Sequence, residues 1–156
     1  MKKLILAMTV VACAWAAAPA FAQSTPAPTA AAPMMTGDRL YQALGEKPGL
    51  VRLMDDFMVR LLADPRTGPH FKPANQERVK TQLVDQLCSV TGGPCVYKGA
   101  DMKSSHSNLD ITKSDFHALV EVLQQSMDAQ GIAFSVQNKL LARLAPMHRD
   151  VITVEN

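Results

Sequence analysis

Apolar residues recur at intervals of three and four along most of this chain, and that spacing constrains the fold more than any other feature. The clearest run lies between Pro48 and Pro65 and comprises Leu50, Leu53, Met54, Phe57, Met58, Leu61 and Leu62. Such spacing places the side chains on one face of an α-helix. Proline is tolerated in a first helical turn but disrupts a helix interior, so Pro48 fits the start of this helix and Pro65 its end.

Three later segments of the chain show the same periodicity, each bounded by its own start and stop signals. Their predicted caps are Asn75, the capping-box pair Thr112 and Asp115, and Ser135. The first two segments are predicted to end at Gly92-Gly93-Pro94 and Gly131, and Pro146 is predicted to bend the third helix or mark its final turns. Their predicted buried stripes are Val79, Leu83, Leu87 and Val90; Phe116, Leu119, Val120, Leu123 and Met127; and Val136, Leu140, Leu141, Leu144 and Met147. Strand-like alternation does not occur at comparable length, so the predicted fold class is all-α.

Among the four histidines, His106 is the one whose context directs it toward an apolar region. A short helical turn is predicted over residues 102–109, and it places Met102, His106 and Leu109 on one side. A neutral imidazole is a competent metal ligand, although spacing alone favours an ordinary core histidine. The other three are predicted to be surface or rim residues: His70 in a loop, His117 and His148. The sequence shows no Ser/His/Asp set, paired-carboxylate cleft or phosphate loop.

The first 22 residues have the pattern of an export signal. Lys2 and Lys3 precede the apolar run LILAMTVVACAWAAA, and AFA before Gln23 fits the small-residue cleavage rule. The run is too short to span a bilayer comfortably, so no membrane span is expected. We expect cleavage after residue 22 and a periplasmic or otherwise exported protein. Processing at VVAC, which would place a lipid on Cys13 and anchor a lipoprotein, is the alternative.

Residues 23–37 are rich in Pro, Ala and Thr, which predicts a flexible linker before a folded domain at 38–156. Loss of the signal would leave 14 basic and 14 acidic residues, where the 156-residue chain has a formal charge of +2. A neutral domain without a basic stripe makes nucleic acid an unexpected partner. The oligomeric state is left open.

Cys88 and Cys95 are the cysteines that would survive signal cleavage, and in an exported domain they predict a disulfide. Closing so short a loop stabilises a fold by roughly 2 to 3 kcal/mol in the chain-entropy description. Two separately packed thiols are the alternative. A Cys/His metal site is disfavoured because no second cysteine pair or close histidine completes a ligand set.

The order of motifs resembles the group I truncated haemoglobins over residues 40–152. The segments that carry the resemblance are DDF…LADPR, GGP..Y.G..M...H...IT and LAP…D. The resemblance implies a truncated 2-on-2 globin fold, in which two helices pack across two others and enclose a haem, haem b. It maps the proximal histidine, which ligates the iron, onto His106.

The resemblance also implies which side chains contact the haem. They are Phe57, Met58, Phe71, Val79, Leu83, Leu87, Tyr97, Met102 and His106. Phe71 matches the aromatic residue that packs on the haem face, and the stripe Val79, Leu83 and Leu87 would line the ligand side. Lys103, Arg78 and Lys80 flank the expected pocket as cationic partners for the haem carboxylates.

This chain departs from the family pattern on the ligand side of the haem. Met58 stands where the family usually has Tyr, and Val79 and Leu83 stand where a Gln or other donor is usual; Gln82 and Gln86 lie off the stripe. A pocket without donors predicts faster oxygen release and quicker oxidation to ferric iron. Met58 is expected to fill the space of the Tyr, with axial ligation of the iron by its sulfur as the alternative.

A further departure is Glu46, at the position of the second glycine of a Gly-Gly pair in the family, which is expected only to adjust a turn. The function that the resemblance implies is reversible binding of a diatomic gas, oxygen or else nitric oxide or carbon monoxide. Alternatives are a nitric oxide dioxygenase or peroxidase-like enzyme served by an external reductase, a His/Met electron-transfer protein, and a haem-free helical interaction module of the cell envelope.

Overall fold

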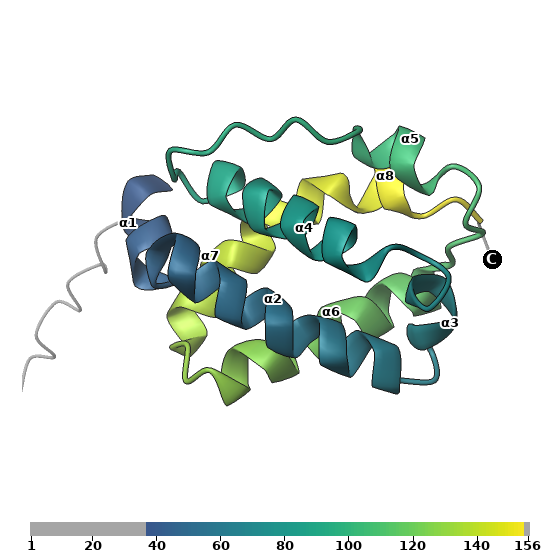
Figure 1. Ribbon diagram of the computed structural model, residues 1–156, viewed down its shortest axis with the longest axis horizontal. Helices are drawn as coiled ribbons and strands as arrows, with labels where there is room; N and C mark the ends of the chain where they lie inside the picture. Colours follow the sequence, from purple (N-terminus) through teal and green to yellow (C-terminus); the bar gives the residue numbers. More distant parts are fainter. Residues whose placement is uncertain (1–36, 155–156) are drawn as a thin grey trace, which may run out of the picture. The chain divides into compact units, whose positions relative to one another are not determined.

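The computed structural model describes residues 37–154, and every regular element in that range is helical (Figure 1). The elements are α1 (Gly37–Ala43), α2 (Glu46–Ala63), α3 (Gly68–Phe71), α4 (Gln76–Val90), α5 (Met102–His106), α6 (Lys113–Ala129), α7 (Phe134–Leu144), the 3₁₀ turn η1 (Ala145–Met147) and α8 (His148–Val151). The all-α prediction is therefore confirmed. The predicted export signal, Cys13 and residues 23–36 of the predicted linker lie outside the described residues.

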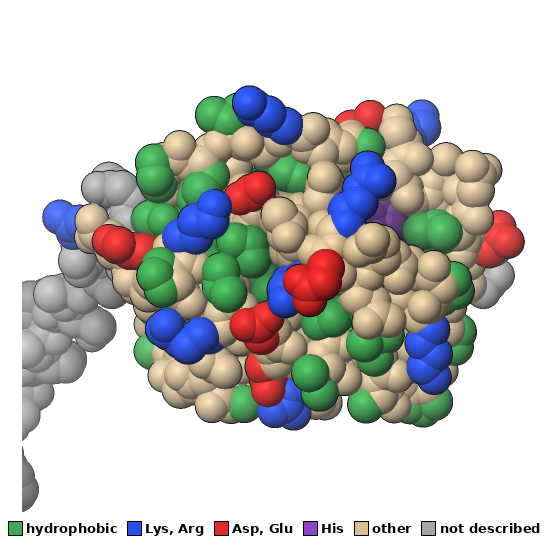
Figure 2. Space-filling view, viewed as in Figure 1, with side chains coloured by type: hydrophobic (Ala, Val, Ile, Leu, Met, Phe, Trp, Pro, Cys, Tyr) green, Lys and Arg blue, Asp and Glu red, His purple; other side chains and the backbone are tan. Residues whose placement is uncertain are grey.

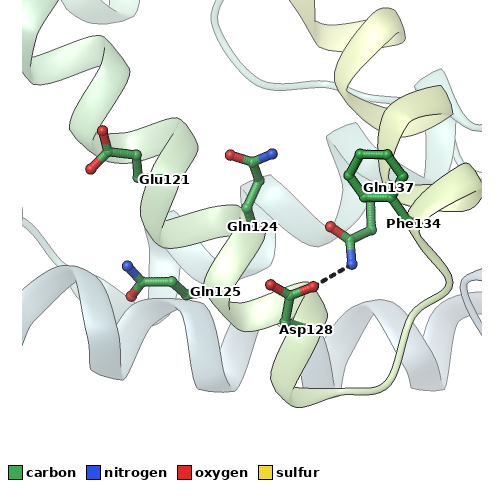
Figure 3. A pocket seen from close by; sticks show the side chains of 6 residues that line it. All are labelled: Glu121, Gln124, Gln125, Asp128, Phe134 and Gln137. Carbon is green, nitrogen blue, oxygen red and sulfur yellow. Dashed lines mark hydrogen bonds between the residues drawn. The ribbon is translucent and has the colours of Figure 1, made fainter.

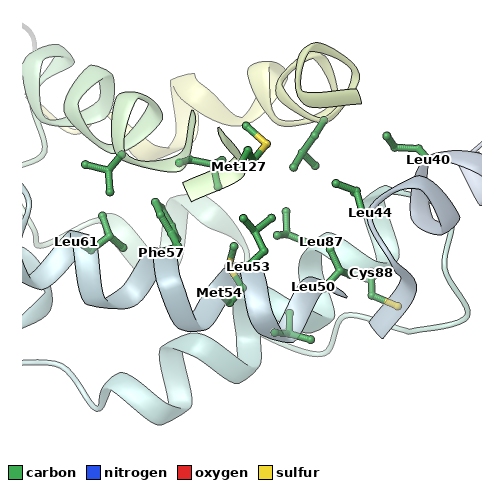
Figure 4. Packing of buried hydrophobic residues seen from close by; sticks show 14 residues of the cluster. Leu40, Leu44, Leu50, Leu53, Met54, Phe57, Leu61, Leu87, Cys88 and Met127 are labelled. Atoms are coloured by element: carbon green, nitrogen blue, oxygen red, sulfur yellow. The ribbon is translucent and has the colours of Figure 1, made fainter. Parts of the chain in front are cut away.

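The core lies between two pairs of helices. Helix α2 packs along α4 and also against α6, and α6 packs against α7 (Figure 1). The fully buried side chains between them include Leu50, Leu53, Met54 and Leu61 of α2, Met127 of α6 and Leu140 of α7 (Figure 4). Full burial of one such side chain contributes about 1.5–3 kcal/mol, so this α2 face contributes substantially to the stability of the fold.

The local signals that predicted the helix ends act as expected. The Asn75 Oδ1 atom accepts a hydrogen bond from the Arg78 backbone N–H at 3.0 Å, and α4 begins at the next residue. Thr112 and Asp115 form a reciprocal capping box at the start of α6. Gly131 takes a positive φ of 66° just beyond α6, a conformation that glycine adopts without steric cost.

Three predicted details of the helices are wrong. Helix α7 begins at Phe134 after Ala133, so Ser135 lies inside the helix and does not cap it. Helix α5 ends at His106, and Leu109, in the turn that follows, is 42% exposed. The segment around His70, expected to be a loop, forms the short helix α3, whose first turn contains a proline.

The predicted stripes of α4 and α6 are only partly right. On α4, Leu87 is buried, but Val79, Leu83 and Val90 are half-buried, and the fully covered neighbours are Val84 and Cys88. On α6, Leu123 and Met127 are buried, whereas Phe116, Leu119 and Val120 are half-buried. The start of α6 contacts two short elements, α3 through His70 and α8 through His148, and Leu119 packs against the edge of the core.

Candidate functional site

The site is built around α5, a helix of only five residues. Asp101 caps it: the carboxylate accepts hydrogen bonds from the Ser104 backbone N–H at 2.9 Å and from the Ser104 hydroxyl at 2.6 Å. These bonds hold the pKa of Asp101 below its usual range. Helix α5 packs against α8 (Figure 1). The cap and this packing fix the position of His106, the last residue of the helix.

The imidazole of His106 is half-buried and oriented by its own helix. Its Nδ1 atom lies 2.7 Å from the backbone carbonyl oxygen of Met102. A carbonyl can only accept a hydrogen bond, so Nδ1 carries the proton and, in the neutral ring, Nε2 carries the lone pair. Within residues 37–154 no hydrogen bond engages Nε2. A metal-ligating histidine typically has this arrangement, with the second nitrogen donating to a carbonyl.

Gln86 of α4 reaches the same region, which the sequence did not predict. Its side chain is 9% exposed, and its Nε2 atom lies 3.4 Å from the Sδ atoms of both Met102 and Met147. Thioether sulfur is a weak acceptor, so this amide is buried without a strong partner. Gln86 was predicted to lie off the ligand-side stripe, and its amide contacts the helix that carries His106.

The residues expected on the ligand side differ in how deeply they are covered. Met58 is buried at 7% exposure but stands outside the connected core cluster, which Phe57 and Leu87 join. Phe71 and Leu83 are half-buried and pack on the edge of that cluster. Three expected ligand-side residues lack a hydrogen-bond donor. Of these, Met58 is buried, whereas Val79 and Leu83 are left partly uncovered by the protein alone.

The chain between α4 and α5 is anchored at two points. A disulfide joins Cys88, in α4, to Cys95, as predicted, so neither sulfur is a free thiol. Further on, the Tyr97 hydroxyl donates to the Ala100 carbonyl at 3.0 Å and lies 3.4 Å from Gln82 Oε1. Burial raises the pKa of Tyr97, so the phenol stays protonated and acts as a donor. These contacts hold the segment that leads to α5.

Of the other three histidines, His148 is the first residue of α8, the helix that packs against α5. His117 and His148 are exposed, as predicted, and the His148 ring lies 6.0 Å from the ring of Phe116. His70 is half-buried, with Nε2 3.7 Å from Asp115 Oδ1. Within the described part of the chain, no group of three or more His, Cys, Asp or Glu side chains converges as a metal site.

Of the three cations expected near the haem carboxylates, Lys80 is engaged elsewhere. Its Nζ atom lies 3.0 Å from Asp55 and 2.9 Å from Glu77, which raises the pKa of Lys80 and binds it to the α2–α4 surface. Its role toward the haem carboxylates stays a prediction. Arg78 and Lys103 are exposed.

Two surface hollows lie apart from His106. One, of about 380 Å³, lies between α6 and α7 and is lined by Glu121, Gln124, Gln125, Asp128, Phe134 and Gln137 (Figure 3). The other, of about 240 Å³, lies between α2 and α4, on the face where Figure 2 shows apolar side chains among Lys, Arg, Asp and Glu. Neither contains a histidine or a cysteine. No helix in residues 37–154 has the length and apolar character needed to cross a membrane.

The residues of the domain fit a haem. The oriented imidazole of His106 supplies one ligand nitrogen, and the half-buried Leu83, Phe71 and Phe116 supply apolar surface that the protein alone leaves partly uncovered. The buried amide of Gln86, which contacts Met102 of α5 and Met147, lacks a strong hydrogen-bond acceptor. Together with the two helix pairs, these features define the class of the protein as a truncated 2-on-2 globin.

Comparison with known proteins agrees with this class. The sequence profile of the bacterial-like globins matches residues 39–153. The group 1 truncated haemoglobin of Tetrahymena thermophila is 30% identical over 94 residues, which are 60% of this chain and 78% of that protein. The group 1 truncated haemoglobin GlbN of Mycolicibacterium paratuberculosis is 29% identical over 116 residues, 74% of this chain and 85% of that protein.

A solved structure shows the same architecture. The truncated haemoglobin from Tetrahymena pyriformis in its Fe(III) form superposes with a TM-score of 0.70 at 26% identity, covering 72% of this chain and 97% of that one. The chain belongs to the bacterial-like globin family, and its similarity is to the group 1 truncated haemoglobins. Globins bind haem, and proteins of this family typically bind small gases.

Proposed function

We propose that this chain is a haem b protein that binds a diatomic gas reversibly, with His106 as the proximal ligand of the iron. The observation that carries the proposal is the 2.7 Å contact between His106 Nδ1 and the Met102 carbonyl oxygen. This hydrogen bond fixes the tautomer, orients the ring and leaves Nε2 available. Bound haem would supply an iron centre with one position open to a gas.

The chain's own residues determine how a gas would be held. Met58 and Leu83, at the family's donor positions, have no N–H or O–H group, and neither has Val79. An apolar ligand side excludes water but offers a polarised gas no hydrogen bond. This composition favours quick exchange of the gas over tight retention. In this proposal Met58 fills the space of the family's Tyr, and axial ligation by its sulfur stays an alternative.

The location of the protein is part of the proposal. The pattern of residues 1–22 and the Cys88–Cys95 bridge both suit an exported protein, because disulfides persist in oxidising compartments. Cell fractionation should find the mature chain, beginning at residue 23, in the periplasmic fraction. A mature chain that retains Cys13 with a lipid would show the lipoprotein alternative to be right.

Hemin titration of the purified apoprotein tests the function. We expect wild-type protein and the control variant His117→Ala to develop an intense absorption band at about 400 nm that saturates at one haem per chain. His106→Ala should bind hemin weakly and lose it to a competing apoglobin. Equal uptake by His106→Ala and wild type would refute the proposal, and a colourless protein that takes up no hemin would favour the haem-free interaction module.

A further inference from the structure

Gln86 lies at a junction of three elements that the proximal ligand depends on. It extends from α4 and reaches Met102, the first residue of α5, and Met147, the last residue of η1. Its Nε2 atom carries two N–H groups, and each of the two Sδ atoms lies 3.4 Å from that nitrogen. One primary amide can therefore donate to both sulfurs at once.

Met102 connects this amide to His106. The side chain of Met102 contacts Gln86, while its backbone carbonyl oxygen accepts from His106 Nδ1 at 2.7 Å. Movement of Met102 would therefore move the acceptor that sets the tautomer and direction of the imidazole. In the described residues no hydrogen bond joins Gln86 to His106, so the hydrogen-bonded route from Gln86 to the ring passes through Met102.

Helix α5 needs such external support because it is too short to be stable alone. A helix of five residues forms barely more than the first turn, which is unfavourable to nucleate. Its fixed points are the Asp101 cap, the packing on α8, and the contact of Met102 with Gln86. Only the last of these joins α5 to the long helix α4.

We propose that Gln86 is a positioning residue for the proximal histidine: its amide anchors Met102 and Met147, and so fixes the His106 imidazole before haem arrives. The proposal rests on the proposed function only for the consequence at the iron. The hydrogen-bond geometry of the apoprotein stands independently of haem. Loss of the amide should leave the fold intact, because an apolar side chain of equal length removes the donors without leaving a new unpaired group.

The test replaces Gln86 with Met, which has the same unbranched length and no N–H group. The matched control is Gln76→Met, the same substitution at the exposed first residue of α4. In the apoprotein, ¹⁵N NMR of the ring should show wild-type His106 as the Nδ1–H tautomer. In Gln86→Met the shifts should move toward an average of two tautomers, and α5 amide protection from hydrogen exchange should fall about 5- to 10-fold, as expected for one lost hydrogen bond.

Met102→Leu provides a second route to the same result, because it removes the sulfur but keeps the backbone carbonyl. It should reproduce the NMR change if Gln86→Met does not fold. In haem-loaded ferrous protein, the iron–histidine stretching vibration should shift in Gln86→Met and stay unchanged in Gln76→Met. Unaltered His106 shifts in both Gln86→Met and Met102→Leu would overturn the positioning role. Altered shifts in an apoprotein that takes up no hemin would support that role while refuting the proposed function.

Discussion

The disulfide between Cys88 and Cys95 allows a quantitative prediction about stability. The two residues are separated by seven positions, and the chain-entropy relation for so short a loop gives about 2.5 kcal/mol of stabilisation at 25 °C. A domain of this size loses about 4 °C of melting temperature per kcal/mol. Cys95→Ser should therefore melt about 10 °C below the oxidised wild-type protein. The substitution is made at half-buried Cys95 because Cys88 is fully buried, and its thiol can stay in place.

Thermal unfolding followed by circular dichroism, with and without a phosphine reductant, provides the assay and its control. Reduced wild-type protein should melt close to Cys95→Ser, and the reductant should not change the melting of the variant. Chemical unfolding should give similar m-values for both proteins, since the same surface is exposed. A difference below about 3 °C between the oxidised wild type and Cys95→Ser would refute the loop-closure reasoning, because it is under a third of the expected shift.

Three further predictions concern the ligand side, a turn and an ion pair. Met58→Tyr should slow oxygen release from haem-loaded protein about tenfold relative to Met58→Phe, since only the phenol adds a donor worth about 1.4 kcal/mol; equal rates in stopped-flow would contradict this. Glu46 has a left-handed φ of 57°, so Glu46→Gly should raise the free energy of unfolding in urea by about 0.5–1 kcal/mol, whereas Glu46→Ala should not. The hydrogen bonds from Arg66 lower the pKa of Asp64 to about 2, below its unfolded value of about 3.9. The stability that this pair contributes is therefore present above about pH 4 and is lost as the pH falls toward 2. The stability difference between wild type and Asp64→Asn should shrink across that pH window, and a constant difference would show that the pair does not act through ionisation.

Helix boundaries were largely predictable from the sequence because local chemistry determines them. Pro48, Asn75 and the Thr112–Asp115 box each act on backbone groups within a few residues, and each lies where the structure uses it. Ser135 was wrongly predicted to cap α7, because a serine next to an apolar run resembles a cap even when the helix is capped two residues earlier, at Ala133. Local patterns are reliable only where no competing start is close by.

Contacts across the site were less predictable, because they depend on how separate helices are rotated toward one another. Gln86 contacts Met102 and Met147, which lie 16 and 61 positions away, and no local pattern encodes either distance. The same limit explains Lys80, whose partner Asp55 lies on another helix. A signal was nevertheless present: Gln86 is a polar residue directly before the buried Leu87, in a helix whose clearest pattern is its apolar stripe.

The half-covered start of α6 has a consequence for how such a protein matures. Neighbouring helices leave part of the apolar surface uncovered at three residues, Phe116, Leu119 and Val120. Under the proposed function, a newly exported chain would expose this apolar surface until it bound haem. During that interval the apoprotein would be open to proteolysis and to aggregation with other copies of the chain. The supply of haem would therefore determine the yield of the haem-bound protein.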